Sequence, residues 1–327
     1  MEALIRAFRG KRVVVIGDVV ADEFVYGRVA RVSREAPVLI LEYDSTEIVP
    51  GGAGNAANNI AALGGHVALV ARVGRDDAGT RVVAALHRRV DPRFLVRRSG
   101  GTTVVKTRIL AGGVHSAKQQ IVRIDRAVTR PADARDHQAI EKAAVTAARQ
   151  ADAVLVSDYG SGIVTPALVR KIASQLRRDG HPIPILVDSR YRLLEYTGLT
   201  MSTPNQSEVE QALGVRIGDD LRALERAGRD MLKRTRMQAV LVTRGSRGMA
   251  LFTAGAPTVH IPISGTEFIV DVTGAGDTVV ATVTLALAAG GTFEAAARLA
   301  NAAGGLVVMK RGTATVSAAE LRTALNE

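Results

Sequence analysis

Two aspartates bracket two glycines in the stretch DVTGAGD, residues 271–277, which lies between a strand-like apolar run and a long helical one. Gly274 and Gly276 permit backbone angles and close approaches that a side chain would prevent. In a strand, turn and helix of this kind, the amides of Ala275, Gly276 and Asp277 would point outward at the helix N-terminus, where an anion binds favourably. Asp277 could then accept a proton from an attacking hydroxyl during phosphoryl transfer, which needs mainly positioning and charge stabilisation. Helix capping alone would need neither both glycines nor the second aspartate, so the pattern favours chemistry at Asp277.

A second glycine turn, PGGAGNAANNIAALGG at residues 50–65, could hold a polyol. Gly52 would allow a close approach of the ligand, and Asn55 offers both donors and acceptors of hydrogen bonds. The stretch also fits the dinucleotide pattern G-x-G-x-x-A, but a proline interrupts the strand leading into it and the pattern has many false positives. Asn55, Asn58 and Asn59 could equally be caps or solvated side chains, which we expect of at least one of them.

Carboxylate side chains lie at the end of one predicted strand and on the first turn of one predicted helix. Asp18 and Asp22 come where a strand-like run would open into a ligand crevice, and Asp22 could grip two sugar hydroxyls, although an aspartate there is as often a cap. Asn205 and Glu208 lie three residues apart on the opening turn of a helix. Glu208 could order a water bound to Mg²⁺ near phosphates, and a capping pair fits the spacing about as well.

A nucleotide could lie at the end of the run MQAVLVTRG, where Thr243, Gly245 and Gly248 come together. The chain has no G-x-x-x-x-G-K-[ST] motif, so it is not a P-loop enzyme. Its six histidines are scattered without a metal-binding spacing.

Short runs rich in Val, Ile and Leu alternate with helical patterns along the chain. Continuous apolar runs are typical of strands buried on both faces, and strand–helix–strand repetition indicates an α/β fold with a mainly parallel, doubly wound sheet. Strands are predicted at residues 12–18, 66–74, 151–158, 183–188, 198–205 and 237–245, and helices at 137–150, 166–178 and 219–235.

Two segments interrupt this rhythm, at about residues 23–49 and 102–126. Both carry alternating Thr- and Val-rich patterns without a helix, so we expect a small antiparallel β lid over the main domain. The exposed edge of such a sheet is a liability unless it is covered. Pairing two lids would cover it, so we expect a homodimer through the lid.

Composition excludes several classes of protein. Of the 327 residues 47% are hydrophobic and none is cysteine, which leaves no disulfide, thiolate metal site or cysteine nucleophile. We find no signal peptide and no run that spans a bilayer, so we expect a cytoplasmic protein without a membrane partner. The net charge of +11 comes from scattered basic residues with few aromatics, so we expect no nucleic-acid partner. A solvated basic surface would account for most of this charge, and attraction of small anions such as nucleotides and sugar phosphates is the functional alternative.

Taken together, these stretches resemble the ribokinase-like (PfkB) family of carbohydrate kinases. Its signatures GG-x-x-N and D-T-x-G-A-G-D stand here as GGAGN, residues 51–55, and DVTGAGD, residues 271–277. The resemblance covers essentially the whole chain, which implies a single kinase domain over residues 1–327. Within the family, stretches such as TPNQSEVE, DVTGAGDTVVA and KRGTATVS are similar to the kinases of D-glycero-D-manno-heptose 7-phosphate.

Those kinases phosphorylate the anomeric O1 on the way to the ADP-heptose of lipopolysaccharide. Many bacteria fuse the kinase to a nucleotidyltransferase domain. Because this chain ends just after the kinase motifs, we expect the stand-alone form.

The resemblance also implies roles for particular residues, with a sugar phosphate and ATP as ligands and Mg²⁺, and K⁺ in some relatives, as cofactors. Asp277 would be the base, and Gly274, Ala275 and Gly276 the anion hole. The sugar would be held by Asp22, Gly52 and Asn55, and its 7-phosphate by the lid cations Lys106, Arg108 and Arg123, which could equally be a solvated face. The phosphate–Mg²⁺ region would include Asn205 and Glu208, the nucleotide pocket Thr243, Gly245, Gly248 and Asn301, and a monovalent-cation site Asp271, Thr273 and Gly312.

Two departures from the family pattern bear on the sugar. The usual D-P-K is Asp188, Ser189 and Arg190 here, and Arg190 would offer a planar fork in place of a point charge. The segment at residues 111–120 is longer than usual. A kinase of another sugar, sugar phosphate or nucleoside therefore remains the alternative, and a non-catalytic nucleotide- or sugar-binding regulator a further one, which the intact DVTGAGD disfavours.

Overall fold

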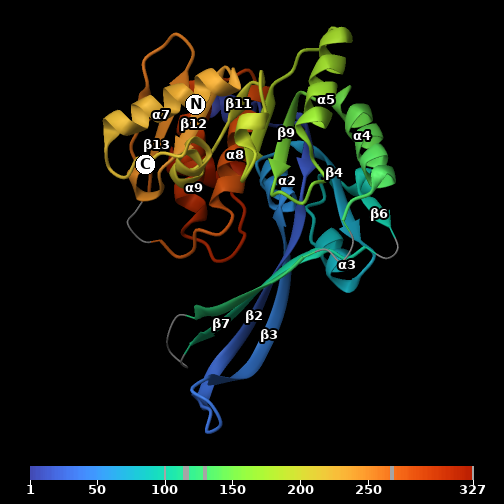
Figure 1. Cartoon of the computed structure of the whole chain (residues 1–327), viewed down its shortest axis with the longest axis vertical. Helices are drawn as coiled ribbons and strands as arrows, with labels where there is room; N and C mark the ends of the chain where they lie inside the picture. The colour runs from blue at the N-terminus through green and yellow to red at the C-terminus, as the bar shows by residue number, and fades with distance from the viewer. Residues whose placement is uncertain (99–100, 113–117, 128–130, 266–268, 326–327) are drawn as a thin grey trace.

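The computed structural model describes residues 1–98, 101–112, 118–127, 131–265 and 269–325, which form a main α/β body with a long β lid projecting from it (Figure 1). The main sheet has the strand order β14-β13-β12-β11-β10-β9-β1-β4-β5, with β6 pairing β4. Its pairings are parallel except β12–β13 and β13–β14, which are antiparallel. The strands are β1 (Arg12–Gly17), β4 (His66–Gly74), β5 (Val90–Asp91), β6 (Val96–Arg98), β9 (Ala153–Asp158), β10 (Ile185–Ser189), β11 (Met201–Ser202), β12 (Ala239–Thr243), β13 (Met249–Thr253) and β14 (Val259–Ile261).

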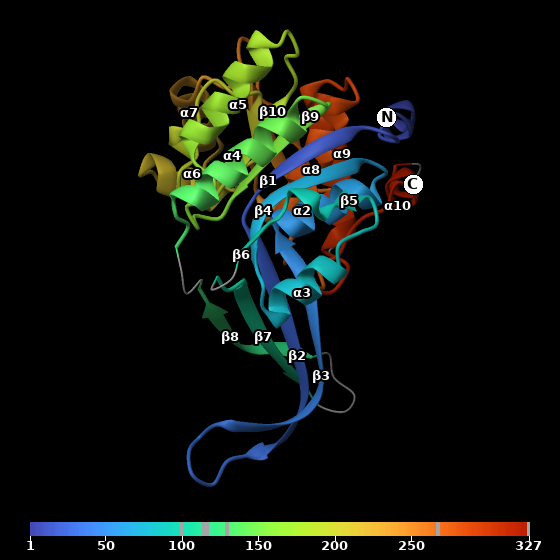
Figure 2. The same ribbon diagram turned by 90° about the vertical axis from the view of Figure 1, so that its right-hand side faces the viewer.

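Helices cover both faces of this sheet (Figures 1 and 2). Alternate residues of β1 show why: Val13 and Val15 pack into one core, while Val14 and Ile16 pack into the other. The first core is shared with α1 (Glu2–Arg6), α2 (Ala53–Ala62), α3 (Asp77–Ala84), α8 (Ala275–Ala288), α9 (Phe293–Val307) and α10 (Ala318–Ala324). The second is shared with α4 (Ala134–Ala148), α5 (Pro166–Arg178), α6 (Gln206–Leu213) and α7 (Leu221–Thr235). The predicted doubly wound fold is confirmed.

The lid is a four-stranded sheet of order β3-β2-β7-β8, made of β2 (Val19–Val32), β3 (Leu39–Gly52), β7 (Val104–Gly112) and β8 (Gln119–Arg126). The segments predicted for it are confirmed, but the sheet is not wholly antiparallel, because the central pair β2–β7 is parallel. The chain enters the lid twice from the main body, along β2 and along β7. Both strands therefore run outward, and β3 and β8 return (Figures 1 and 2).

Two local predictions differ from the structure. The strand expected at 198–205 is only the two-residue β11. The apolar run before DVTGAGD is not a strand in residues 269–274, and residues 266–268 lie outside the described part. The amides of Val270 and Asp271 both donate to the carbonyl of Val308, at 2.8 and 3.0 Å, so the end of α9 holds this segment away from a sheet edge.

None of the helices in the described residues combines the length and the apolar character that a bilayer crossing requires.

Candidate active site

The candidate site lies where the carboxyl ends of β9, β10 and β12 meet the N-terminus of α8. The lid extends from the main body on this side (Figure 1). Doubly wound sheets bind their ligands in the crevice at this end of the strands. A cavity of about 180 Å³ and a more polar one of about 270 Å³ lie here side by side and share Thr243, Val272 and Gly276. The sequence predicted this location from DVTGAGD.

Asp277 is the buried acid at the centre of the site, with 3% of its surface exposed. One carboxylate oxygen accepts a hydrogen bond from Asn55 Nδ2, at 2.9 Å, and the other from the hydroxyl of Tyr159, also at 2.9 Å. Burial raises the pKa of Asp277 to about 7, against the lowering effect of these two bonds. The α8 N-cap is Gly274, without a side-chain cap, so the capping alternative for Asp277 is wrong.

Asn55 is held in place by a second buried asparagine. Asn59, fully buried on the next turn of α2, donates to the Asn55 side-chain oxygen at 3.1 Å, which leaves the Asn55 amide nitrogen facing Asp277. The hydroxyl of Thr278 on α8 in turn donates to the Asn59 side-chain oxygen at 3.1 Å. A Cβ on Gly274 would lie 2.4 Å from Asn55 Nδ2, so the first glycine of the turn allows this approach. Asn59 is thus neither a cap nor solvated.

Tyr159 is a site residue that sequence reasoning missed. It follows β9 in a loop held by two buried carboxylates: Asp18 accepts from the Tyr159 amide at 2.8 Å and from the Ser161 hydroxyl, and Asp158 accepts from the Gly160 amide at 3.0 Å. Burial and the charge of Asp277 raise the pKa of the phenol well above 10, so Tyr159 stays a hydrogen-bond donor. Its position at a strand's carboxyl end, in SDYGSG, was the available signal.

The glycine turn before α8 exposes fewer amides than expected. The amide of Ala275 donates to the carbonyl of Val272 at 3.2 Å. This leaves the amides of Gly276 and Asp277, which have no acceptor within the helix because they lie in its first turn. A Cβ on Gly276 would meet nothing within 4 Å, so this residue faces the open cavity. Two amides rather than three are available for an anion there.

The polar cavity brings together three acids and a cation, namely Asp158, Asp188, Glu208 and Arg190. Asn205 and Glu208 form a reciprocal capping box on α6, with bonds of 2.9 Å each way, so the capping interpretation of this pair is confirmed. Desolvation raises the pKa of Glu208, and desolvation with the charges of Glu208 and Asp277 raises that of Asp188 well above its usual value. Crowded carboxylates beside an open cavity suit a hydrated Mg²⁺, whose charge would relieve their repulsion.

The neighbouring cavity is lined mainly by apolar side chains, among them the exposed Ile263, Ile269 and Val272. All four residues predicted for the nucleotide pocket line it, namely Thr243, Gly245, Gly248 and Asn301. Asn301 on α9 donates to the carbonyl of Pro262 at 2.8 Å, which fixes one wall. An apolar slot beside a polar cavity, where Arg190 and a carboxylate-bound Mg²⁺ could meet anionic groups, fits a base followed by phosphates.

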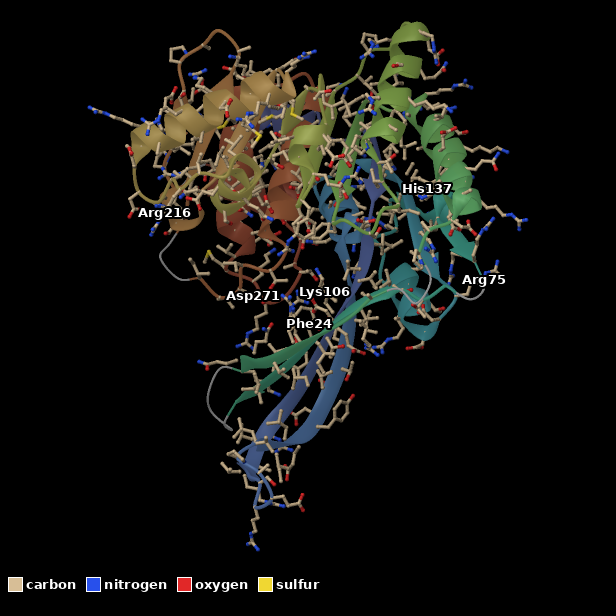
Figure 3. The ribbon with its side chains drawn as sticks, viewed as in Figure 1. Phe24, Arg75, Lys106, His137, Arg216 and Asp271 are labelled. Atoms are coloured by element: carbon tan, nitrogen blue, oxygen red, sulfur yellow. The ribbon has the colours of Figure 1, made fainter. Side chains whose placement is uncertain are left out.

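The lid presents its cations beside Asp277. Lys106 lies 5.3 Å from the ring centre of Tyr159, and desolvation lowers the pKa of this lysine. Arg108 forms an ion pair with the buried Asp22 and lies over the ring of Phe24. Figure 3 shows Lys106 and Phe24 at the junction of the lid with the main body.

Arg123 on β8 lies opposite Arg108 in the sheet and pairs with Asp125 at 2.9 Å. The three cations therefore follow one face of the lid, with Lys106 nearest to Asp277. Part of the longer segment at 111–120, residues 113–117, lies outside the described residues.

The three residues predicted for a monovalent cation also lie together. The carboxylate of Asp271 accepts from the amides of Thr273 and Gly312, at 2.9 and 3.0 Å. The buried hydroxyl of Thr313 has no hydrogen-bond partner within the described residues. Oxygen atoms with unused lone pairs at this position suit a cation.

Gly52, predicted at the sugar, ends β3 at the start of α2 with a φ of 57°, and a Cβ there would lie 2.5 Å from the carbonyl of Asp18.

Comparison with known proteins identifies similar chains. Residues 11–320 match the family described as pfkB family carbohydrate kinase. The bifunctional protein HldE of Caulobacter vibrioides is 41% identical over 323 residues, which are 97% of this chain and 64% of that protein. The bifunctional protein HldE of Geobacter metallireducens is 41% identical over 323 residues, which are 98% of this chain and 64% of that protein. This chain therefore spans less than two thirds of the length of either relative.

Solved structures share the fold at low sequence identity. Arabidopsis thaliana ribokinase complexed with ribose and ATP has a TM-score of 0.75 at 20% identity, over 97% of this chain and 99% of that chain. Escherichia coli phosphofructokinase-2 in complex with substrates and products has a TM-score of 0.76 at 18% identity, over 97% of this chain and 98% of that chain.

Proposed function

Because the chain belongs to the pfkB family of carbohydrate kinases, we propose that residues 1–327 form one kinase domain that phosphorylates D-glycero-D-manno-heptose 7-phosphate at O1. The products would be the 1,7-bisphosphate, an intermediate on the way to ADP-heptose, and ADP. The carrying observation is a buried acid, Asp277, which follows Gly276, a residue that lines both adjoining cavities, and lies near a lid face that bears three cations. The sugar itself is inferred from the stretches that resemble heptose phosphate kinases.

In the proposed mechanism, the O1 hydroxyl of the sugar lies against Asp277 and gives its proton to a carboxylate oxygen. Asn55 and Tyr159 hold that carboxylate, and Asp22 grips sugar hydroxyls from the lid. The amides of Gly276 and Asp277 with the guanidinium of Arg190 stabilise the charge on the transferred phosphoryl group. Mg²⁺, held through Glu208 and Asp188, would neutralise charge on the phosphates of ATP.

The remaining parts of the proposal concern the cation, assembly and compartment. A monovalent cation such as K⁺ would bind at Asp271, Thr273 and Gly312 and strengthen the positive field behind the α8 N-terminus. Two lids would pair into a homodimer. The protein would act in the cytoplasm, where ATP and sugar phosphates are available. A chain without cysteine has no disulfide that would need an oxidising compartment, which agrees with this location.

The test is release of ADP by the purified protein with MgATP and a panel of acceptors. The panel holds D-glycero-D-manno-heptose 7-phosphate, sedoheptulose 7-phosphate, fructose 6-phosphate, fructose, ribose and adenosine. Selective turnover of the heptose phosphate supports the proposal. Preference for another acceptor would overturn the substrate and retain the kinase, an outcome to which Arg190 is relevant because it lines the polar cavity. Binding of ATP with no turnover of any acceptor would favour a regulator.

We expect the turnover number to fall as pH falls through about 7. Asp277 must be ionised to accept the proton, and burial raises its pKa to about 7. Above this pH the carboxylate is ionised and the turnover number is at its maximum. Each pH unit below it lowers the turnover number about tenfold. Steady-state rates between pH 5.5 and 9 check this, and an acid limb centred near pH 4 would contradict it.

Tyr159→Phe should move that acid limb upward by about one pH unit. The phenol donates to the charged form of Asp277 and so lowers its pKa, and a hydrogen bond to a charged group contributes about 1.5–3 kcal/mol. At pH 7 turnover should fall about fivefold, because the ionised fraction of Asp277 drops from about one half to about one tenth, and at pH 9 it should approach that of the unmodified protein. Tyr191→Phe, at a tyrosine 62% exposed, is the matched control. A loss that is equal at every pH would argue against this role.

The lid should hold the dimer through its exposed apolar side chains. All of β8 is exposed, with Ile121, Val122 and Ile124 between 45% and 48%, and Tyr43 on β3 is 67% exposed. We expect light scattering to give twice the monomer mass for the unmodified chain and the monomer mass for Val122→Lys with Ile124→Lys. The control Val215→Lys changes an equally exposed valine after α6 and should leave the dimer intact. A monomeric mass for the unmodified chain at micromolar concentration would contradict the assembly.

A further inference from the structure

A cavity of about 600 Å³ takes no part in the proposed reaction. It is lined by residues at the amino ends of β1, β4 and β5 and by the C-terminal part of α4. Figure 2 shows the arrangement of these elements. The active-site crevice is at the opposite ends of these parallel strands, about 20 Å away along the six residues of β1. This volume is within the range of small-molecule sites.

The inner wall of the cavity is apolar. Val14 and Ala68 contribute the sheet surface, Ala147 the helix surface and Phe94 one side. Ala68 on β4 is only partly buried, although Val70, two residues further along the same face of the strand, is fully buried. A space over the sheet is normally filled by a side chain, so this gap could accept an apolar group from a ligand.

The rim of the cavity is cationic. Arg12, Arg88, Arg89 and Arg93 line it, and Asp91 is the one acid among the described residues that do. Asp91 is already occupied by a two-pronged ion pair with Arg93, with bonds of 2.7 to 3.0 Å. Within the described part of the chain, Arg12 and Arg88 form no ion pair with a carboxylate. Desolvation and the charges of Arg89 and Arg88 lower the pKa of the neighbouring His87, which agrees with a positive field here.

The loop that carries two of these cations is anchored. The amide of His87 donates to the side-chain oxygen of Asn58 on α2 at 2.8 Å, and Asn58 Nδ2 donates to the carbonyl of Ala85 at 3.2 Å. The guanidinium of Arg89 donates to the carbonyl of Ala61 at 3.4 Å. Asn58 therefore fixes the loop at 85–89, and positions prepared before binding lower the entropic cost of holding a ligand.

We propose that this cavity binds a small amphiphilic anion, an aromatic or aliphatic group that carries a phosphate, sulfonate or carboxylate. The apolar part would lie against Ala68 and Phe94, and the anionic head would meet Arg12 and Arg88 at the rim. Bidentate hydrogen bonding by arginine suits such oxyanions. This site is independent of the proposed kinase reaction.

The test uses the fluorescent anion 1-anilinonaphthalene-8-sulfonate, since the chain has no tryptophan to interfere. The cavity variants are Arg88→Glu, which reverses a rim charge, and Ala68→Leu, which fills the wall. Arg178→Glu, an exposed arginine on α5 outside the cavity, is the matched charge control, and Gly276→Val obstructs the nucleotide cavity, the other apolar site that could take the dye.

We expect both cavity variants to weaken one class of dye site at least tenfold, while Arg178→Glu and Gly276→Val retain it. Phenyl phosphate should displace the dye from that site and phenol, which lacks the charge, should not. Unchanged binding in both cavity variants, loss only in Gly276→Val, or displacement by phenol as well as phenyl phosphate would overturn the proposal. Circular dichroism of each variant confirms that a loss of binding is not a loss of fold.

Discussion

Asp277→Asn is expected to lower the turnover number at least about a thousandfold while ATP still binds. The carboxylate is the group placed to take the O1 proton, and a positioned general base contributes roughly 10²- to 10⁴-fold to a rate. The replacement keeps the shape of the side chain, and its amide could still bond Asn55 and Tyr159. Release of ADP and calorimetric titration with MgATP measure the two quantities separately.

The same variant should show a second, independent signature in its stability. The folded protein raises the pKa of Asp277 from 3.8 to about 7, so the folded state holds this proton more strongly than the unfolded state. The contribution of this group to stability is therefore greatest below about pH 4 and falls as pH rises through 7, by about 4 kcal/mol at most.

Asparagine carries no such charge, so Asp277→Asn should melt at an equal or higher temperature at pH 8 and lose that advantage at pH 5. A variant that retains turnover would remove Asp277 from the mechanism. A variant that melts far below the parent at pH 8 would show that the side chain holds the fold together instead.

How far the sequence predicts this molecule depends on whether a feature is local. The turn before α8 is local, because two glycines and a following apolar helix within 20 residues already require it, and its position at the cavities agrees with the prediction. The lid segments are predicted for the same reason, from alternation within each strand. The parallel direction of the β2–β7 pair could not be predicted in this way, since it depends on where the chain leaves the main body.

The partners of Asp277 show the limit most clearly. Asn55 is 222 residues away along the chain and Tyr159 is 118 residues away, so no spacing pattern connects them. Asn55 was predicted because it belongs to the GGAGN signature, whereas Tyr159 lies in SDYGSG, which is part of neither signature. Asn205 and Glu208 illustrate another limit, because one pair of residues both caps α6 and lines the polar cavity, and the spacing alone cannot separate the two uses.

Arg123→Gln is the change that tests the substrate rather than the chemistry. With heptose 7-phosphate as the acceptor, kcat/KM should fall about 10- to 100-fold, because a hydrogen bond to a charged group contributes about 1.5–3 kcal/mol. With the heptose that lacks the phosphate, it should change less than about twofold. Most of the loss should appear in KM, since the 7-phosphate takes no part in the transfer at O1. Steady-state kinetics with the two sugars measures the difference.

Arg126→Gln is the matched control on the same strand. Arg126 lies on the opposite face of the lid, where it pairs with Glu23 at 2.6 Å, and its exposure is similar to that of Arg123. Both arginines are exposed, so each ion pair should contribute only about 0–1 kcal/mol to folding, and neither variant should unfold the lid. If Arg123→Gln lowers kcat/KM equally for both sugars, Arg123 does not bind the 7-phosphate. If Arg123→Gln changes kcat/KM for neither sugar, the 7-phosphate lies closer to Lys106 and Arg108 than to Arg123. The sugar would then lie on the lid with its phosphate end nearer to Asp277 than proposed.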